Sequence, residues 1–239
     1  MADLLDFKDI YENYIGVGNR GAKIWFFGLE YGGGLDKNKN VAVTEDYFKK
    51  LKKGREKFIA YLSNNFADKN EGAFYGTLYY LLKNIKNIDY SYEDSITVNK
   101  ESNFFYSNLS FLKFPREGRD AEKTLLEHYK KIFMNDLGRR DKYLTNNILN
   151  ARYKKNFEKY LNEPKIIFFL NKSYLKKYQV LLGLTPLFKD PQNESIPVKW
   201  GNTSIDFYKS GIHTIINCPN FTIADDTKKE LVKRVNVLL

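Results

Sequence analysis

Four short runs rich in apolar residues are spaced along the chain. The first, at residues 23–28, reads Lys-Ile-Trp-Phe-Phe-Gly and shows no alternation between apolar and polar positions. Such a run is typical of a strand that is buried on both faces of a sheet. Similar runs occupy residues 104–109, 165–170 and 213–217. The pattern therefore predicts four core strands.

Segments with helical spacing of apolar residues lie between and after these strands. Asp225 and the capping-box spacing of Thr227 and Glu230 mark the start of the last helix. Residues 189–202 contain two prolines and predict a surface excursion, with a short edge strand around residues 196–200. Alternating strands and helices predict an α/β fold, with αβα layers around a central, mainly parallel sheet of four to five strands. The expected helices cover residues 44–65, 76–85, 120–133, 151–161 and 174–182, and the residues from about 226 onward.

Composition narrows the class of protein. The 239 residues are enough for one substantial core, so we expect a single domain over residues 1–239. Apolar residues make up 43% of the chain, and no apolar run approaches the roughly 20 residues that a membrane helix needs. The first residues lack the layout of a secretory signal, and the single cysteine, Cys218, can form no internal disulfide, so we expect a cytoplasmic protein. With only His128 and His213 besides that cysteine, we expect no metal and no cofactor.

The charge of the chain points to its partner. A formal net charge of +10 favours a polyanion, and nucleic acid is the first candidate. The 18 tyrosines and 18 phenylalanines add weight because bases stack on aromatic rings. Lysine runs such as residues 49–53 are equally well explained as solvated helix faces. We therefore expect a nucleic acid, double- or single-stranded, as the partner and no membrane, and we expect a monomer.

A glycine-rich turn follows the first strand. Residues 28–34 read Gly-Leu-Glu-Tyr-Gly-Gly-Gly, which lacks the spacing of a dinucleotide loop and is not followed by the Gly-Lys-[Ser/Thr] of a phosphate loop. What remains is a carboxylate, Glu30, at the carboxyl end of a central strand. Ligands of open α/β sheets bind at that edge. The alternative is that Glu30 stabilises the start of a helix.

Four segments resemble motifs of the uracil-DNA glycosylase superfamily, in the same order along the chain. Residues 28–32 resemble the Gly-x-(Asp/Asn)-Pro-(Gly/Tyr) motif, whose acidic or amide residue positions the attacking water. Residues 74–82 resemble the Phe-x-Gly-x-x-x-x-Leu-Leu pattern, whose phenylalanine stacks on the extruded base. Residues 105–115 look like the strand whose asparagine reads the pyrimidine edge, and residues 215–220 are placed like the His-Pro-Ser motif. The resemblance implies a uracil-DNA-glycosylase-like fold and a monofunctional DNA glycosylase that excises uracil or a modified pyrimidine, leaving an abasic site.

The chemistry explains why such residues are needed. Breaking an N-glycosidic bond builds positive charge on the sugar and negative charge on the base, so the site needs an anion and hydrogen bonds to the base. The base must first be turned out of the duplex, stacked and read along its edge. In this resemblance the catalytic residues are Glu30, Asn217 and Cys218; the base contacts are Leu29, Tyr31, Phe74, Asn108 and Asn220; and the DNA contacts are Gly32, Gly33, Phe221 and Ile223.

Each assignment has an ordinary alternative, and two positions depart from the family pattern. Phe74 alone would be read as a core residue, and Asn108 alone as a turn residue at a strand end. Tyr31 stands where the family has proline, and Cys218 where it has the histidine that donates to the leaving base. A thiol is a poor substitute for that donor, which Asn217 or Asn220 could supply instead; a nucleophilic role of the thiol lacks an identifiable base.

Two further features bear on the substrate. Phe221 and Ile223 are candidate wedges for the space left by the extruded base, although they could equally staple the last helix. Residues 35–73 form an inserted helical segment with a basic helix at 47–58. Because long insertions often act as lids or binding loops, we hypothesise a larger base, such as a modified cytosine in phage DNA, and a role in antiviral defence, with DNA repair as the alternative. The rivals are a non-catalytic nucleic-acid binder and a hydrolase of free nucleosides or nucleotides.

Overall fold

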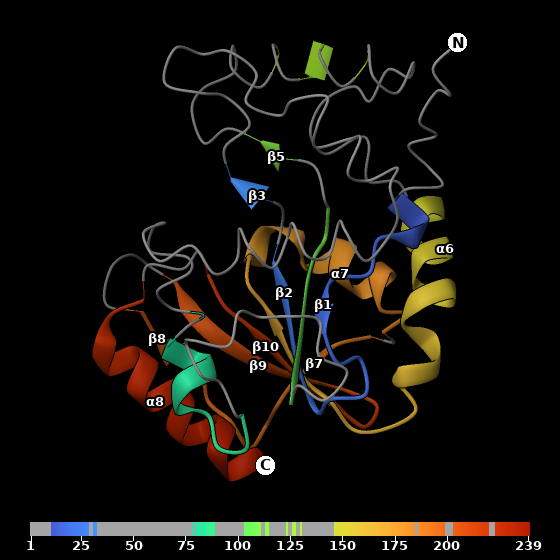
Figure 1. The fold of residues 1–239 in the computed structure, drawn as a ribbon. Coiled ribbons are helices and arrows are strands. Elements are labelled where there is room, and N and C mark those ends of the chain that lie inside the picture. Colours follow the sequence, from blue (N-terminus) through green and yellow to red (C-terminus); the bar gives the residue numbers. More distant parts are fainter. Residues whose placement is uncertain are drawn as a thin grey trace.

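The computed structural model describes residues 11–28, 31–32, 78, 80–88, 103–110, 113–114, 123, 126–127, 130, 146–184, 186–198, 203–219 and 223–239 (Figure 1). Its strands are β1 (Val17–Gly18), β2 (Ile24–Gly28), β3 (Tyr31–Gly32), β4 (Phe104–Asn108), β5 (Lys113–Phe114), β6 (Ile166–Phe169), β7 (Phe188–Lys189), β8 (Ile196–Pro197), β9 (Ser204–Ser210) and β10 (His213–Asn217). Its helices are α6 (Asn146–Asn156), α7 (Leu175–Leu181) and α8 (Asp225–Leu238), with the 3-10 turns η1 (Glu158–Tyr160) and η2 (Lys172–Tyr174). Residues 80–84 are also helical.

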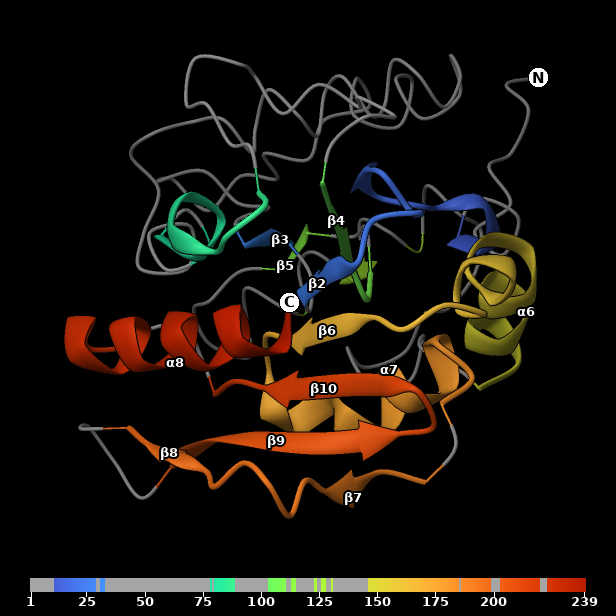
Figure 2. The same cartoon turned by 90° about the horizontal axis from the view of Figure 1, so that it is seen from below.

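The main sheet has a parallel centre. Its strand order is β1-β4-β2-β6-β10-β9-β7, and β8 also pairs with β9 (Figure 2). The strands β4, β2, β6 and β10 run parallel, whereas β1, β7, β8 and β9 pair antiparallel with their neighbours. The predicted α/β class and the four core strands are confirmed. The sheet nevertheless has eight strands rather than four to five, because continuous apolar runs reveal only strands that are buried on both faces.

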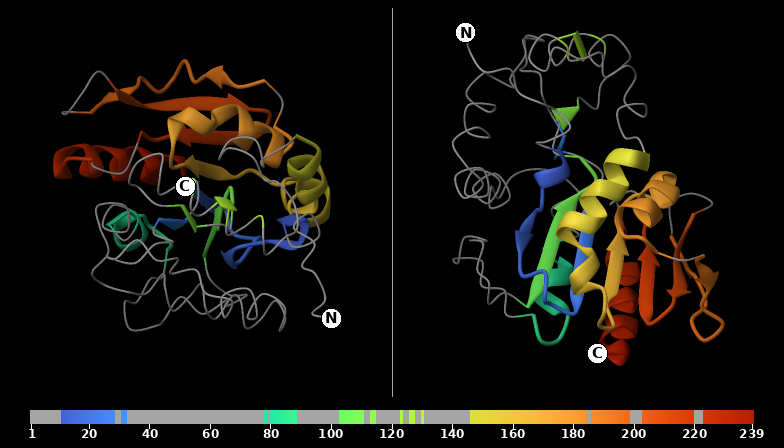
Figure 3. Two further views of the ribbon diagram at one scale, coloured as in Figure 1. Left: turned by 90° about the horizontal axis from the view of Figure 1, so that it is seen from above. Right: turned by 90° about the vertical axis from the view of Figure 1, so that its right-hand side faces the viewer.

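Helices cover both faces of this sheet, which gives three layers (Figure 3). Side chains alternate between the faces along each strand. One face, formed by Trp25, Phe27, Phe105 and Phe169, packs against α6, η1 and α7 and is called the α6–α7 face. Phe157, which directly follows α6, places its ring 5.7 Å from that of Phe27 and 6.0 Å from that of Phe105.

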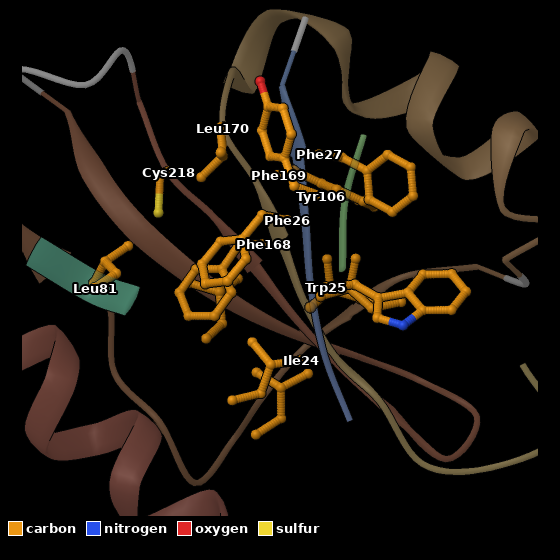
Figure 4. Close-up of a cluster of buried hydrophobic side chains, with 14 of the residues drawn as sticks. Ile24, Trp25, Phe26, Phe27, Leu81, Tyr106, Phe168, Phe169, Leu170 and Cys218 are labelled. Carbon is orange, nitrogen blue, oxygen red and sulfur yellow. The ribbon is translucent and has the colours of Figure 1, made fainter. Parts of the chain in front are cut away.

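The opposite face of the sheet is called the α8 face and is formed by Ile24, Phe26, Phe168 and Cys218. It packs against α8 and the helical residues 80–84 (Figure 3). The rings of Phe26 and Phe168 stack at 4.7 Å between neighbouring strands. Figure 4 shows this set of side chains on one side of the strands, with Trp25 and Phe27 on the other. Both faces therefore belong to one continuous aromatic core.

The longest antiparallel strand, β9, is absent from the predicted elements. Its sequence, Ser-Ile-Asp-Phe-Tyr-Lys-Ser, mixes polar and apolar positions, and its burial is incomplete. Gly211, with a φ of +56°, follows β9 and turns the chain directly into β10. A glycine in the left-handed region between two strands is the signal of a hairpin. That signal was present in the sequence and would have identified the strand.

Two helix boundaries differ from the predictions. The helix predicted at residues 151–161 begins earlier, at Asn146, and is interrupted at Phe157. The capping box predicted for α8 is wrong: the helix begins after Ala224, which makes no side-chain cap, so Thr227 lies inside the helix. The Glu230 carboxylate instead accepts a hydrogen bond from Arg234 Nε at 2.8 Å. The helix predicted at residues 44–65 lies outside the described residues. No helix in the described part of the chain is long and apolar enough to cross a membrane.

Candidate functional site

Three of the predicted site residues lie at one edge of the sheet, where the four central parallel strands have their carboxyl ends. Asn108 ends β4, Asn217 ends β10, and Cys218 directly follows. The amide of Cys218 donates to the carbonyl of Phe169 at 2.8 Å, which extends the sheet past the end of β10. The strand pair β3–β5 lies beyond this edge (Figure 1). It is the edge at which open α/β sheets bind ligands.

The side chain of Asn108 lies directly over Gly28 of the neighbouring strand. The two residues are register partners, and a Cβ added to Gly28 would come within 2.2 Å of Asn108 Oδ1 and 2.8 Å of the Tyr106 hydroxyl oxygen. Only glycine fits here. The Tyr106 hydroxyl donates a hydrogen bond of 2.5 Å to Asn108 Oδ1. Asn108 Nδ2 is buried and has no hydrogen-bond partner among the described residues.

The backbone at the end of β4 is held by Arg152, a residue that the sequence pattern does not reveal. Arg152 is fully buried on α6. Its Nη1 donates to the carbonyls of Asn108 at 3.0 Å and Leu109 at 2.8 Å, its Nε donates to the carbonyl of Tyr14 at 2.7 Å, and its Nη2 donates to Ser107 Oγ at 2.8 Å. The guanidinium also lies 4.5 Å from the centre of the Tyr14 ring. These bonds fix the strand end that carries Asn108.

Asn217 lies on the other face of the sheet from Asn108. Its register partners are Phe169 on β6 and Asp206 on β9, so its side chain belongs to the α6–α7 face. Asn108 shares the α8 face with Gly28. Asn217 is 2% exposed, and its Oδ1 has no hydrogen-bond partner within the described part of the chain. The two predicted asparagines therefore share an edge but do not converge on one face.

A charged cluster lies beside Asn217. Lys172 Nζ is 2.5 Å from Asp206 Oδ2, and the hydroxyls of Ser195 and Ser204 each donate to Asp206 Oδ1 at 2.7 Å. Burial by itself would raise the pKa of Asp206, but the hydrogen bonds from Lys172 and the two serines lower it overall. The cluster is therefore an ion pair with a fully bonded carboxylate. Its signal in the sequence is weak, because Lys172 and Asp206 come from separate strand ends.

Cys218 occupies the position of the histidine in the family that the chain resembles. It is fully buried on the α8 face (Figure 4). Burial raises the pKa of the Cys218 thiol to about 12, with Lys172 opposing and Asp206 reinforcing the shift. The group is thus a neutral thiol near pH 7, which disfavours the nucleophilic role and leaves only a weak hydrogen-bond donor.

The chain continues past the edge through Tyr31 and Gly32. These residues form β3, which pairs in parallel with Lys113 and Phe114 of β5. The backbones that follow β2 and β4 therefore pair again beyond the main sheet. Leu29, Glu30, Gly33, Phe74, Asn220 and Phe221 lie outside the described residues.

The structure does not support the assignment of Ile223 as a wedge. It is 4% exposed and belongs to the hydrophobic core directly before α8. A wedge side chain must be free to enter a base step, whereas this one is already packed. Ile223 is therefore a core residue in this structure.

His213 is the first residue of β10 and lies at the amino end of the strand, opposite the edge that carries Asn217. It is buried, and burial together with the charge of Lys165 lowers the pKa of its imidazole, partly offset by a hydrogen bond with the backbone of Leu161. The strand separates His213 from the carboxyl edge. It therefore cannot replace the missing histidine of the last motif.

Comparisons with known proteins identify no relative. No protein-family model matches the chain, and no curated protein matches it. Within the described residues, no three His, Cys, Asp or Glu side chains are grouped so that they could hold a metal ion. That the protein works without metal or cofactor stays a prediction.

Proposed function

We propose that the protein is a monofunctional DNA glycosylase that hydrolyses the N-glycosidic bond of an extruded uracil or modified pyrimidine and leaves an abasic site. The observation that carries the proposal is Asn108 Nδ2, which is buried and has no partner among the described residues, at the edge where open α/β sheets bind ligands. An unsatisfied buried donor costs about 1–3 kcal/mol. A base that accepts its hydrogen bond would recover that cost. The resemblance of four segments to glycosylase motifs supports the same function.

The chain supplies an acid shortly after the strand residue that pairs with Asn108. Glu30 follows Gly28, the register partner of Asn108, by two positions. In the proposed reaction water attacks C1′ of the sugar, the C1′–N bond breaks, and the electron pair leaves with the base. Glu30 accepts the proton of the water and its charge stabilises the cationic sugar. Phe74 stacks on the base, as the resemblance implies.

Two observations support Asn108 as the group that stabilises the leaving base in the proposed reaction. Cys218 is a weak donor, and the side chain of Asn217 belongs to the other face of the sheet from Asn108. Asn108 Nδ2 therefore takes this role in the proposed reaction. Lys172 also lies at the edge, but its ammonium is engaged by Asp206 at 2.5 Å and Ser204 at 3.2 Å, which disfavours a Schiff base and supports a monofunctional enzyme.

A panel of oligonucleotides tests this function. DNA that carries uracil, thymine, cytosine or modified cytosines, single-stranded or in duplexes, is incubated with the protein and then treated with alkali, which cuts at abasic sites. We expect cuts at one class of base, and we expect Glu30→Gln to lower their rate by about 100-fold or more because it removes the general base. Glu158→Gln, which changes an exposed carboxylate on η1, is the control and should leave the rate unchanged.

A non-catalytic DNA binder is the second candidate, and the buried neutral thiol of Cys218 favours it. Tight binding to DNA without alkali-sensitive sites on any base would support this candidate against the glycosylase. Salt separates both from an enzyme of free nucleosides. The net charge of +10 predicts that DNA binding weakens as salt rises, whereas hydrolysis of a neutral nucleoside would not.

A further inference from the structure

We infer that the Tyr106–Asn108 pair makes the site select pyrimidines whose N3 is a hydrogen-bond acceptor, as in cytosine and its derivatives, over those that carry N3–H, as in uracil and thymine. The inference rests on the proposed function, because it assigns a substrate class to the same site. It concerns the direction of one hydrogen bond. That direction is set by groups on β2 and β4.

The amide oxygen of Asn108 is occupied. Tyr106 and Asn108 are two residues apart on β4, so their side chains share the α8 face, and the Tyr106 hydroxyl donates to Oδ1 at 2.5 Å. On another side the oxygen lies against Gly28, where a Cβ would approach it to 2.2 Å. Both side chains are 1% exposed. An incoming N3–H would therefore meet an acceptor that already has a donor and a close backbone neighbour.

The amide nitrogen of Asn108, Nδ2, is buried and has no acceptor among the residues that the structure describes. An asparagine amide has two donor hydrogens and an oxygen acceptor, and among the described residues only the donor side is without a partner. In this arrangement Asn108 donates to a ligand and does not accept from it.

The two classes of pyrimidine differ at N3, the atom that would meet the Asn108 amide. Cytosine presents N3 and O2 as neighbouring acceptors, whereas uracil presents the donor N3–H between two carbonyl acceptors. An asparagine that uses both ends of its amide can pair with N3–H and a carbonyl at once, which suits uracil. An amide that can only donate pairs with N3 of cytosine but leaves N3–H of uracil without an acceptor. Leaving a buried donor unpaired is how a site rejects the wrong substrate.

The opposite amide orientation makes the opposite prediction. If Nδ2 donated to the Tyr106 oxygen, Oδ1 would be free to accept N3–H, and uracil-type bases would be preferred. The preference of the protein between two matched bases therefore decides between the orientations.

The test uses 5-hydroxymethylcytosine and 5-hydroxymethyluracil, which carry the same 5-substituent and differ in their hydrogen-bonding edge. Each is placed in the same single-stranded oligonucleotide, so that pairing with an opposite base does not contribute. Excision by the wild-type protein and by Tyr106→Phe is measured with the alkali assay. The matched control is Tyr178→Phe, which removes another buried hydroxyl that has no partner among the described residues, on the α6–α7 face.

We expect the wild-type protein to excise the cytosine derivative at least tenfold faster than the uracil derivative. Tyr106→Phe frees Oδ1 and should narrow that ratio about tenfold, whereas Tyr178→Phe should leave it unchanged. Equal rates for the two bases, or a preference for the uracil derivative, would overturn the inference. The wild-type ratio decides even if the Tyr106 variant fails to fold.

Failure of the proposed function has a different signature. If no base is excised, the glycosylase proposal fails, and the affinities for the two oligonucleotides are compared by fluorescence anisotropy. Tighter binding of the cytosine derivative, lost in Tyr106→Phe, would then still support the selection by Asn108. Equal affinities would overturn it.

Discussion

Asn108 and Asn217 end two parallel strands of one sheet, yet their surroundings differ in kind. The Asn108 side chain lies on the α8 face, with the Tyr106 hydroxyl on its oxygen and Gly28 beneath it, whereas Arg152 bonds the backbone carbonyl of Asn108. Asn217 lies on the α6–α7 face, beside a carboxylate that is ion-paired with Lys172. Both are buried, and each keeps one amide atom without a partner in the described part of the chain.

The difference separates recognition from support. The Asn108 amide, whose oxygen already accepts from Tyr106, can only donate to a ligand, and in the proposed function this lets it discriminate between bases. The Asn217 amide lies beside an ion pair that joins η2 to β9. We therefore expect changes around Asn108 to alter both stability and excision, and changes around Asn217 to alter stability but not base selection. The following predictions test that division.

The largest effect is expected for Arg152→Met. The variant removes the Arg152 donors from the carbonyls of Asn108 and Tyr14 and from the hydroxyl of Ser107, at about 1–3 kcal/mol for each group that finds no other, whereas the Leu109 carbonyl keeps the Tyr11 hydroxyl. We expect the free energy of unfolding, measured with urea, to fall by about 3 kcal/mol or more. The rate of excision should fall as well, because the end of β4 that carries Asn108 is then less firmly held.

Hydrogen exchange localises this effect. The amide of Leu109 donates to the carbonyl of Gly28 at 2.7 Å, and the amide of Cys218 donates to that of Phe169 at 2.8 Å. Under native conditions, Arg152→Met should accelerate exchange at Leu109 more than at Cys218. Equal acceleration at both amides would show that the two strand ends are not held independently.

A smaller effect is expected for Gly28→Ala. The new methyl group would overlap Asn108 Oδ1 and the Tyr106 hydroxyl, both in the packed core, so we expect a loss of about 1–3 kcal/mol in the free energy of unfolding. Because the overlap displaces Asn108 itself, the rate of excision should fall by more than the loss of folded protein explains. Gly21→Ala is the control, since its nearest neighbour is the Asn19 side chain at 3.1 Å on the surface. Similar losses of excision in both variants would contradict the role of Asn108.

The sequence predicts those features of the fold and the site that a local pattern of residues can reveal. The four core strands follow from apolar runs because strands buried on both faces contain little else. The position of Asn108 at the end of β4 follows from that strand, and the parallel order places it at the ligand-binding edge. The glycine at 28 stood out in the sequence as part of a turn, but its role under Asn108 depends on the register of two strands.

The rest depends on contacts between distant segments. Arg152 lies in a polar helix whose sequence is typical of a solvated face, and it is buried by the end of β4 together with the rings of Tyr11 and Tyr14. Asp206 and Lys172 meet because β9 turns back beside β10, and the alternating pattern of β9 is weaker than that of a buried strand. The opposite orientation of the two asparagines follows from strand register, which motif order does not contain.

The smallest effect is expected for Asp206→Asn. Because bonds from Lys172 and the two serines lower the pKa of Asp206 in the folded protein, the unfolded chain binds this proton more readily. The stabilisation is therefore complete above the ordinary value of 3.8 and is lost as the pH falls below it. We expect the variant to be about 1 kcal/mol less stable than the wild type at pH 7, with a difference that shrinks towards pH 3. Urea unfolding at both pH values measures it.

The same variant completes the comparison of the two asparagines. Asp206 is the register partner of Asn217 on β9, whereas the direction of the Asn108 amide is set by Tyr106 on β4. The ratio between excision of the cytosine and uracil derivatives should therefore stay at its wild-type value in Asp206→Asn, even as stability changes, with Glu158→Gln as the exposed-carboxylate control. A changed ratio would mean that the ion pair acts on base selection across the sheet, and the division between a recognising and a supporting asparagine would have to be abandoned.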